Sequence, residues 1–238
     1  MGTIVNSAAV LVGGLLGLLL RQGLSKRIEE IAMKLLGLSV FLVGLEGTLS
    51  AMMTVDGEGS LAASGSLLLI VSLLVGGVLG TGLDIDGVLQ RGGRLVEQRL
   101  GREGFARGFV NTSLIVCVGA MAVIGALNDG LTGDSSVLFV KAAMDFVIAV
   151  VLASTLGFGV PFAFLPVLVY QGAITLAAGW LAPVVTGTLL DGICMVGYAI
   201  VVLIGTNFLG WTNIPTANLL PALAGPVLYE VVLRLIPG

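Results

Sequence analysis

Residues 108–160 read GFVNTSLIVCVGAMAVIGALNDGLTGDSSVLFVKAAMDFVIAVVLASTLGFGV, in which two apolar stretches flank a short acidic loop. Each stretch is close to the roughly 20 residues that an α-helix needs to cross a bilayer. The second stretch also carries Lys141 and Asp145, four residues apart. An ionisable side chain at the centre of a membrane helix costs roughly 2.5 to 3.5 kcal/mol on insertion scales, so such groups are paired or face water. The stretch therefore predicts two membrane spans and a polar feature that needs a partner or a function.

The composition of the whole chain favours the same class of protein. Of its 238 residues, 57% are hydrophobic and 11% are charged, with a mean hydropathy of +1.11. So few polar side chains cannot solvate a globule of this size, which indicates an integral membrane protein. The 36 glycines, and the lack of runs that alternate every second residue, favour closely packed helices over a barrel.

Several functional classes find no support in the sequence. The chain has no histidine, which excludes His-based catalysis and His-based metal sites. No Walker loop, no dinucleotide-binding glycine motif and no serine-protease setting occurs. No basic run with interleaved aromatic residues suggests nucleic-acid binding. We therefore expect no enzyme activity, no cofactor, no metal site and no nucleic-acid partner.

We predict an all-α, polytopic transmembrane helical bundle with seven or eight spans. The first seven lie at about residues 3–20, 31–53, 66–83, 109–127, 135–156, 162–181 and 189–209. The last segment contains Pro215, Pro221 and Pro226, which favours a broken or re-entrant helix and leaves the count open. Basic residues follow the first span, so the positive-inside rule predicts an external amino terminus.

Residues 84–108 separate two groups of spans. The segment holds five arginines, and its apolar residues recur at helical spacing. We predict a cytoplasmic amphipathic helix on the inner leaflet, with a solvated linker helix as the alternative. The predicted organisation is then a first repeat at 1–83, the linker helix at 84–108, a second repeat at 109–181 and a C-terminal part at 182–238.

Two sequence shifts indicate an internal repeat. A shift of 105 residues places Asn6 on Asn111, and a shift of 107 residues places Lys34 on Lys141. Each half would contain three spans, so the second half would enter the membrane from the opposite face. This inverted arrangement is common in transporters, which bind their substrates near the midplane between the repeats.

The polar residues within the predicted spans suggest a cavity that binds or conducts a small ion or solute. Its predicted lining is Asp145, Glu46, Lys141, Asn111, Asn6, Gln171, Asn207 and Asn218. Simpler interpretations remain open for several of them. Lys141 and Asp145 could form a self-neutralising pair within one helix, or Lys141 could reach the membrane interface. Glu46 could be an acid kept protonated by burial, and the two asparagines of the repeat could cap or link helices.

Four stretches resemble a known family: GFVNTSLIVCVGAMAVIGALNDGLTGD, the Lys141–Asp145 segment, ASTLGFGVPFAFLPVLVYQGAITLAA and NIPTANLLPAL. They are similar to the YqgA-like bacterial inner-membrane proteins, grouped as domain of unknown function 554, and the likeness extends over nearly the whole chain. The resemblance implies a multi-span inner-membrane protein and brings no activity or substrate.

From its residues we interpret the chain as a small secondary transporter or channel-like permease. The alternative is a membrane scaffold or partner subunit that transports nothing. The expected partners are the lipid bilayer and an unidentified small ion or solute. Pairs of glycines four residues apart, such as Gly13 with Gly17, make a homodimer plausible as well.

Overall fold

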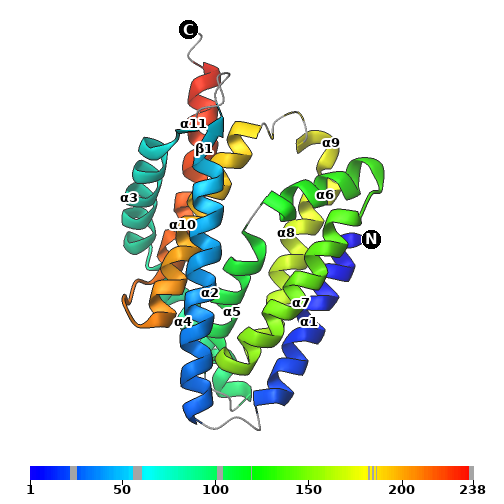
Figure 1. Cartoon of the computed structure of the whole chain (residues 1–238), viewed down its shortest axis with the longest axis vertical. Coiled ribbons are helices and arrows are strands. Elements are labelled where there is room, and N and C mark those ends of the chain that lie inside the picture. Colours follow the sequence, from blue (N-terminus) through cyan, green and yellow to red (C-terminus); the bar gives the residue numbers. More distant parts are fainter. Residues whose placement is uncertain are drawn as a thin grey trace. The chain divides into compact units, whose positions relative to one another are not determined.

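The structure is a computed structural model that describes residues 1–21, 26–55, 61–100, 104–118, 120–181, 183, 185 and 187–235 (Figure 1). The α-helices are α1 (Gly2–Arg21), α2 (Lys26–Met52), α3 (Ser66–Gly82), α4 (Ile85–Leu100), α5 (Phe105–Cys117), α6 (Ala120–Thr132), α7 (Ser136–Leu156), α8 (Phe164–Leu176), α9 (Ala178–Leu181), α10 (Gly187–Leu209) and α11 (Ala224–Leu235). Two 3-10 helices are η1 (Pro161–Ala163) and η2 (Thr216–Leu223), and two short antiparallel strands are β1 (Met53–Val55) and β2 (Leu61–Ala63).

This is the predicted all-α membrane fold. In the described part of the chain, four helices are long and apolar enough to cross a membrane: Gly2–Arg21, Glu30–Met52, Ser136–Leu156 and Gly187–Leu209. The number rises to six if two bent helix pairs, α3 with α4 and α5 with α6, each count as one span. Two shorter apolar helical segments, Pro161–Leu176 and Thr216–Val232, coincide with the predicted sixth span and the proline-rich last segment. The total of seven or eight spans and the inverted repeat remain predictions.

The predicted fourth span, 109–127, is not a straight helix. Its residues fall into α5 and α6, whose axes differ by 64°. Val118 ends α5 because its backbone is extended, with φ −78° and ψ 136°. Hydropathy alone predicted one continuous helix here, since the stretch contains no proline to mark the break.

Contacts between Cα atoms divide the chain into two compact units. Unit 1 contains Met1–Leu36 and Val88–Val184, and unit 2 contains Gly37–Gly87 and Val185–Gly238. Each unit therefore combines two segments that are separated in the sequence. The predicted repeats, residues 1–83 and 109–181, group the chain differently. The internal repeat remains a prediction.

In unit 1, α1 packs along α7, and the two helices run in the same direction (Figure 1). Gly2 lies against Ser135 and Leu138 near the start of α7, whereas Gly17 lies against Val150 farther along it. Glycine is needed on this face of α1 because a side chain would collide with the backbone of the neighbouring segment. A Cβ atom at Gly14, for example, would lie 2.7 Å from the Cα atom of Pro161.

In unit 2, glycines also allow a helix to lie close to the backbone of a neighbouring segment. Helix α3 packs mainly on η2, with α10 and α11 beside it. A Cβ atom at Gly76 would meet the backbone of Ala222, and one at Gly80 would meet the carbonyl oxygen of Asn218. Both glycine pairs of the GxxxG type, on α1 and on α3, thus serve packing within a unit.

Candidate functional site

One face of α1 carries polar side chains into the core of unit 1. Thr3, Asn6 and Ser7 follow one another at spacings of three and four residues, so they lie on the same side of the helix. All three are buried, and Asn6 has no exposed surface. The opposing helices α7 and α8 place their own polar residues against this face, as described below.

Lys141 and Asp145 form an ion pair within α7. The Lys141 ammonium donates to both oxygens of the Asp145 carboxylate, at 2.9 Å to Oδ1 and 2.7 Å to Oδ2. Their side chains are only 9% and 4% exposed, so the pair is buried within unit 1. Cys117, the last residue of α5, lies close enough to interact electrostatically with both charges. The pair is neutral as a whole, which lowers the cost of holding two charges in an apolar region.

An amide pair from α1 and α8 lies beside these charges. Asn6 donates from Nδ2 to Oε1 of Gln171 over 3.2 Å, and both side chains are fully buried. The Asn6 amide also faces the carboxylate of Asp145. Two atoms of the amide pair, Oδ1 of Asn6 and Nε2 of Gln171, have no hydrogen-bond partner among the described residues. A buried acceptor and a buried donor are therefore available next to an ion pair.

Two buried hydroxyl groups have no partner in the described part of the chain either. They belong to Ser7, next to Asn6 on α1, and Thr112 on α5. An unsatisfied buried polar group costs roughly 1 to 3 kcal/mol, so native proteins contain few of them. We call the set of Asn6, Ser7, Lys141, Asp145 and Gln171 the polar cluster. Three of its atoms, Oδ1 of Asn6, Oγ of Ser7 and Nε2 of Gln171, need water or a small polar ligand as a partner.

The polar cluster lies beside a break in the membrane helices. Helix α5 ends at Cys117, and α6 leaves in a different direction. Carbonyl groups in the last turn of an α-helix lack partners within that helix, and they carry the negative end of its dipole. Discontinuous helices of this kind supply the binding groups in many transporters.

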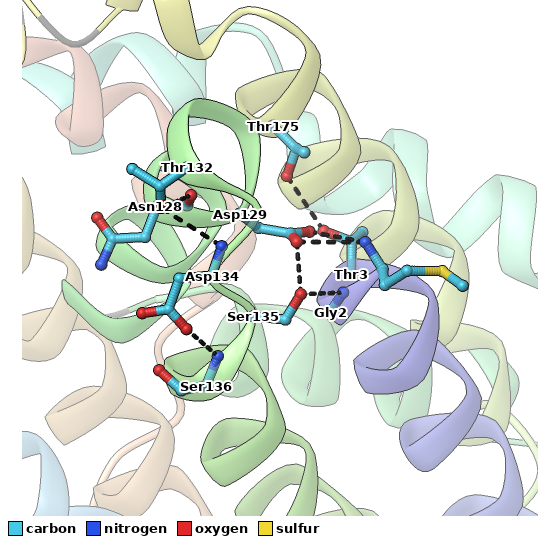
Figure 2. Close-up of polar contacts among 10 residues, drawn as sticks. Gly2, Thr3, Asn128, Asp129, Thr132, Asp134, Ser135, Ser136 and Thr175 are labelled. Atoms are coloured by element: carbon cyan, nitrogen blue, oxygen red, sulfur yellow. Dashed lines mark hydrogen bonds and ion pairs between the residues drawn. The ribbon is translucent and has the colours of Figure 1, made fainter.

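A second group of polar contacts ties the start of α1 to the loop before α7 (Figure 2). The Met1 amine donates to Asp129 Oδ1 and Oδ2 at 3.2 and 3.1 Å, and Ser135 Oγ accepts from the Gly2 N–H at 3.1 Å. Nearby, the hydroxyls of Thr3 and Thr175 lie 3.2 Å apart. In the loop itself, the Ser136 backbone N–H donates to Asp134 over 2.9 Å, which holds the pKa of that carboxyl below its ordinary value. These contacts hold the first residues of α1 against the start of α7. They therefore help to position the polar cluster, most of which lies farther along the same two helices.

The predicted site residues do not all lie in the polar cluster. The structure brings together Asp145, Lys141, Asn6 and Gln171 in unit 1. Asn111, also in unit 1, is half-buried on α5 next to Thr112. The other three predicted residues, Glu46, Asn207 and Asn218, belong to unit 2.

The amides of unit 2 hold local structure. Asn207 Oδ1 accepts from the Ile214 N–H at 2.9 Å and from the Thr212 hydroxyl at 2.7 Å, and its Nδ2 donates to the Ile214 carbonyl. It therefore closes the turn after α10. Asn218 Oδ1 accepts from the Asp86 N–H over 2.7 Å and so caps the first turn of α4. Glu46 is exposed on the surface of α2.

We expect Asn207→Ala to destabilise the protein without affecting any transport. Three hydrogen bonds of the turn would be lost, and the expected cost is about 1 to 3 kcal/mol. Thermal unfolding in detergent would measure the cost. A variant that folds normally but loses solute flux would instead return Asn207 to the predicted pathway.

Sequence reasoning missed Ser7 as a member of the polar cluster, and it missed the buried hydroxyl of Thr112. A usable signal exists for Ser7, since Thr3, Asn6 and Ser7 repeat at helical spacing in an otherwise apolar span. No comparable signal marks Thr112, because serine and threonine often bond to the carbonyl of their own helix, as Ser113 does with Phe109. In the described residues, no group of three or more His, Cys, Asp or Glu side chains could hold a metal ion.

Comparisons with known proteins place the chain among membrane proteins. Residues 1–231 match the family described as "Protein of unknown function (DUF554)". The chain is 28% identical over 225 residues to the "Uncharacterized membrane protein YdfK" of Bacillus subtilis, covering 94% of this chain and 93% of that protein. It is 31% identical over 228 residues to the "Uncharacterized protein YqgA" of Escherichia coli, with the same shares covered. No solved structure matches it. The chain therefore belongs to the DUF554 family, as its resemblance to the YqgA-like proteins predicted.

Proposed function

We propose that this protein is a permease, a small secondary transporter or channel, that moves a small ion or solute across a bacterial inner membrane without chemical conversion. The observation that carries the proposal is the polar cluster of unit 1. There a buried ion pair lies against an amide pair with one free acceptor and one free donor. We also propose that the amino terminus faces outward, as the basic residues after α1 suggest.

The cluster suits ligand binding better than simple helix packing. Packing alone would be served by apolar side chains, since a buried ion pair seldom stabilises a fold more than hydrophobic residues of similar volume. Buried polar atoms without partners add a further cost. Charged residues that face the interior of a membrane bundle typically mark ion or substrate pathways. The adjacent helix break offers backbone carbonyls of the kind that transporters use for binding.

Flux measurements on purified protein in liposomes would test the proposal. Vesicles would be screened with protons, alkali cations, divalent cations, small organic acids and small zwitterions. We expect wild-type protein to carry at least one of these solutes. The double variant Lys141→Met/Asp145→Asn should lose at least 90% of that flux, because it removes both charges together and leaves no unpaired charge to unfold the protein.

The matched control is Asp134→Asn, which neutralises an exposed acid in the loop before α7. It should transport as the wild type does. If the double variant transports normally, the polar cluster is not the pathway. If wild-type protein carries none of these solutes, a non-transporting scaffold or partner subunit explains the chain better.

A further inference from the structure

Unit 2 contains a groove of about 780 Å³ bounded by α3, α10 and α11. One wall is a continuous face of α3 that includes Leu67, Val71, Val75 and Leu79. The facing wall includes apolar residues of α10 and α11, such as Met195. These α3 side chains are 47–75% exposed, so the groove is open along its length.

The length of the groove matches one leaflet of a membrane. Leu67 and Leu79 are twelve residues apart on α3, which corresponds to about 18 Å at the helical rise. The hydrocarbon core of a bilayer is about 30 Å thick, so each leaflet contributes roughly 15 Å. An acyl chain of ordinary length therefore fits along the wall of α3.

One end of the groove is polar. The chain enters α3 there, and α10 begins at the same level, since Gly192 lies against Leu68 and Gly65 lies against Met195. The polar residues that line this end are Thr54, Ser64, Thr188 and Asp191. Among the described lining residues, Asp191 alone carries a formal charge.

A buried hydroxyl lies on the wall below this end. Ser72 lines the groove, is 4% exposed, and its Oγ has no hydrogen-bond partner among the described residues. It is four residues beyond Leu68 on α3, so it lies about 6 Å deeper than Asp191. An acceptor on the ligand at that depth would satisfy this hydroxyl.

From these features we propose that the groove binds a phospholipid with a primary-amine head group. The ammonium contacts Asp191, an ester carbonyl accepts from the Ser72 hydroxyl, and an acyl chain lies along the apolar wall of α3. This lipid site goes beyond the proposed transport function and does not depend on it.

The charge of the lining selects the head group. An anionic head group would be repelled by Asp191, and no described lining residue carries a positive charge to hold it. A quaternary ammonium is attracted to the carboxylate but has no N–H to donate. A primary amine offers both the charge and the hydrogen bond, and charge-assisted hydrogen bonds are the stronger kind.

Native mass spectrometry of the delipidated protein in detergent would test the proposal. Phosphatidylethanolamine, phosphatidylcholine and phosphatidylglycerol with identical acyl chains would be added separately. We expect phosphatidylethanolamine to bind most tightly, with one molecule per chain. Asp191→Asn should weaken its binding up to about fivefold, as expected for an exposed charge pair, and should not weaken phosphatidylglycerol binding.

Two further variants test the wall of the groove. Ser72→Ala should weaken phosphatidylethanolamine binding roughly two- to tenfold, as expected for one lost hydrogen bond. A purely structural serine would show no such change. Val75→Trp should block the groove and abolish retention, whereas Leu74→Trp, a neighbouring exposed residue of α3 outside the lining, should not.

Three results would overturn the proposal. One is equal retention of the three lipids by wild-type protein. Another is equal retention by the Val75→Trp and Leu74→Trp variants. The third is a dimer that Val75→Trp dissociates, because a second copy of the chain would then cover the groove.

Discussion

Replacing Lys141 with methionine is expected to lower the free energy of unfolding by about 3 to 5 kcal/mol. The substitution keeps an apolar chain of similar length but leaves the Asp145 carboxylate, which is 4% exposed on its side chain, without its counter-ion. The loss is a large fraction of the 5 to 15 kcal/mol by which proteins are typically stable. Thermal or denaturant unfolding of the purified protein in detergent would measure it.

The double variant Lys141→Met/Asp145→Leu shows how much the intact ion pair contributes to stability. Its comparison with Lys141→Met then gives the cost of leaving one charge unpaired. Because both charges are removed, we expect its stability to fall within about 1 to 2 kcal/mol of wild type, or to exceed it. Lys34→Met is the control for removing a lysine from a membrane helix, since Lys34 is exposed on α2. It should change stability by about 0.5 kcal/mol or less. If the single and double variants lose equal free energy of unfolding, the unpaired Asp145 charge is not the cause of the loss.

This comparison also bears on function. If the double variant folds as well as wild type, the ion pair is not retained for stability. Loss of solute flux in that same Lys141→Met/Asp145→Leu variant would then reflect the missing charges themselves. A fully stable and fully active variant without charges would reduce the pair to a self-neutralising feature of α7.

Replacing Gly80 with leucine is expected to destabilise unit 2 by about 3 kcal/mol or to prevent folding. A side chain at this position would collide with the main-chain carbonyl of Asn218, and backbone cannot move aside as a flexible side chain does. Overpacking in protein cores typically costs about 1 to 3 kcal/mol, and a backbone collision belongs at the upper end. The capping bond from the Asp86 N–H to Asn218 would be disturbed as well.

Gly82→Leu is the matched control on the same helix. An added Cβ atom at Gly82 meets nothing within 4 Å, and leucine is a better helix former than glycine. We therefore expect this variant to match or slightly exceed wild type in thermal unfolding. If both variants lose equal stability, close approach of α3 and η2 is not the reason for glycine at position 80.

Much of the fold follows from local sequence alone. Long apolar runs placed α1, α2, α7 and α10 close to their observed limits, because a membrane requires about 20 consecutive apolar residues for each straight span. The prolines of the last segment predicted a broken helix, and the structure has a 3-10 helix, η2, before α11 there. The break between α5 and α6 was invisible, since hydropathy measures apolarity and not backbone direction.

For the candidate site, the sequence by itself determined which residues are costly in a membrane, but not where they meet. It singled out Lys141 and Asp145 because their spacing and their charge are both local properties. Only the tertiary structure decided that Asn6 and Gln171, 165 residues apart, bond to each other beside that pair, and that Asn207 and Asn218 serve a turn and a helix cap. The physical reason is that a polar side chain acquires its role from the partner it finds, and contacts between distant segments depend on how whole helices pack.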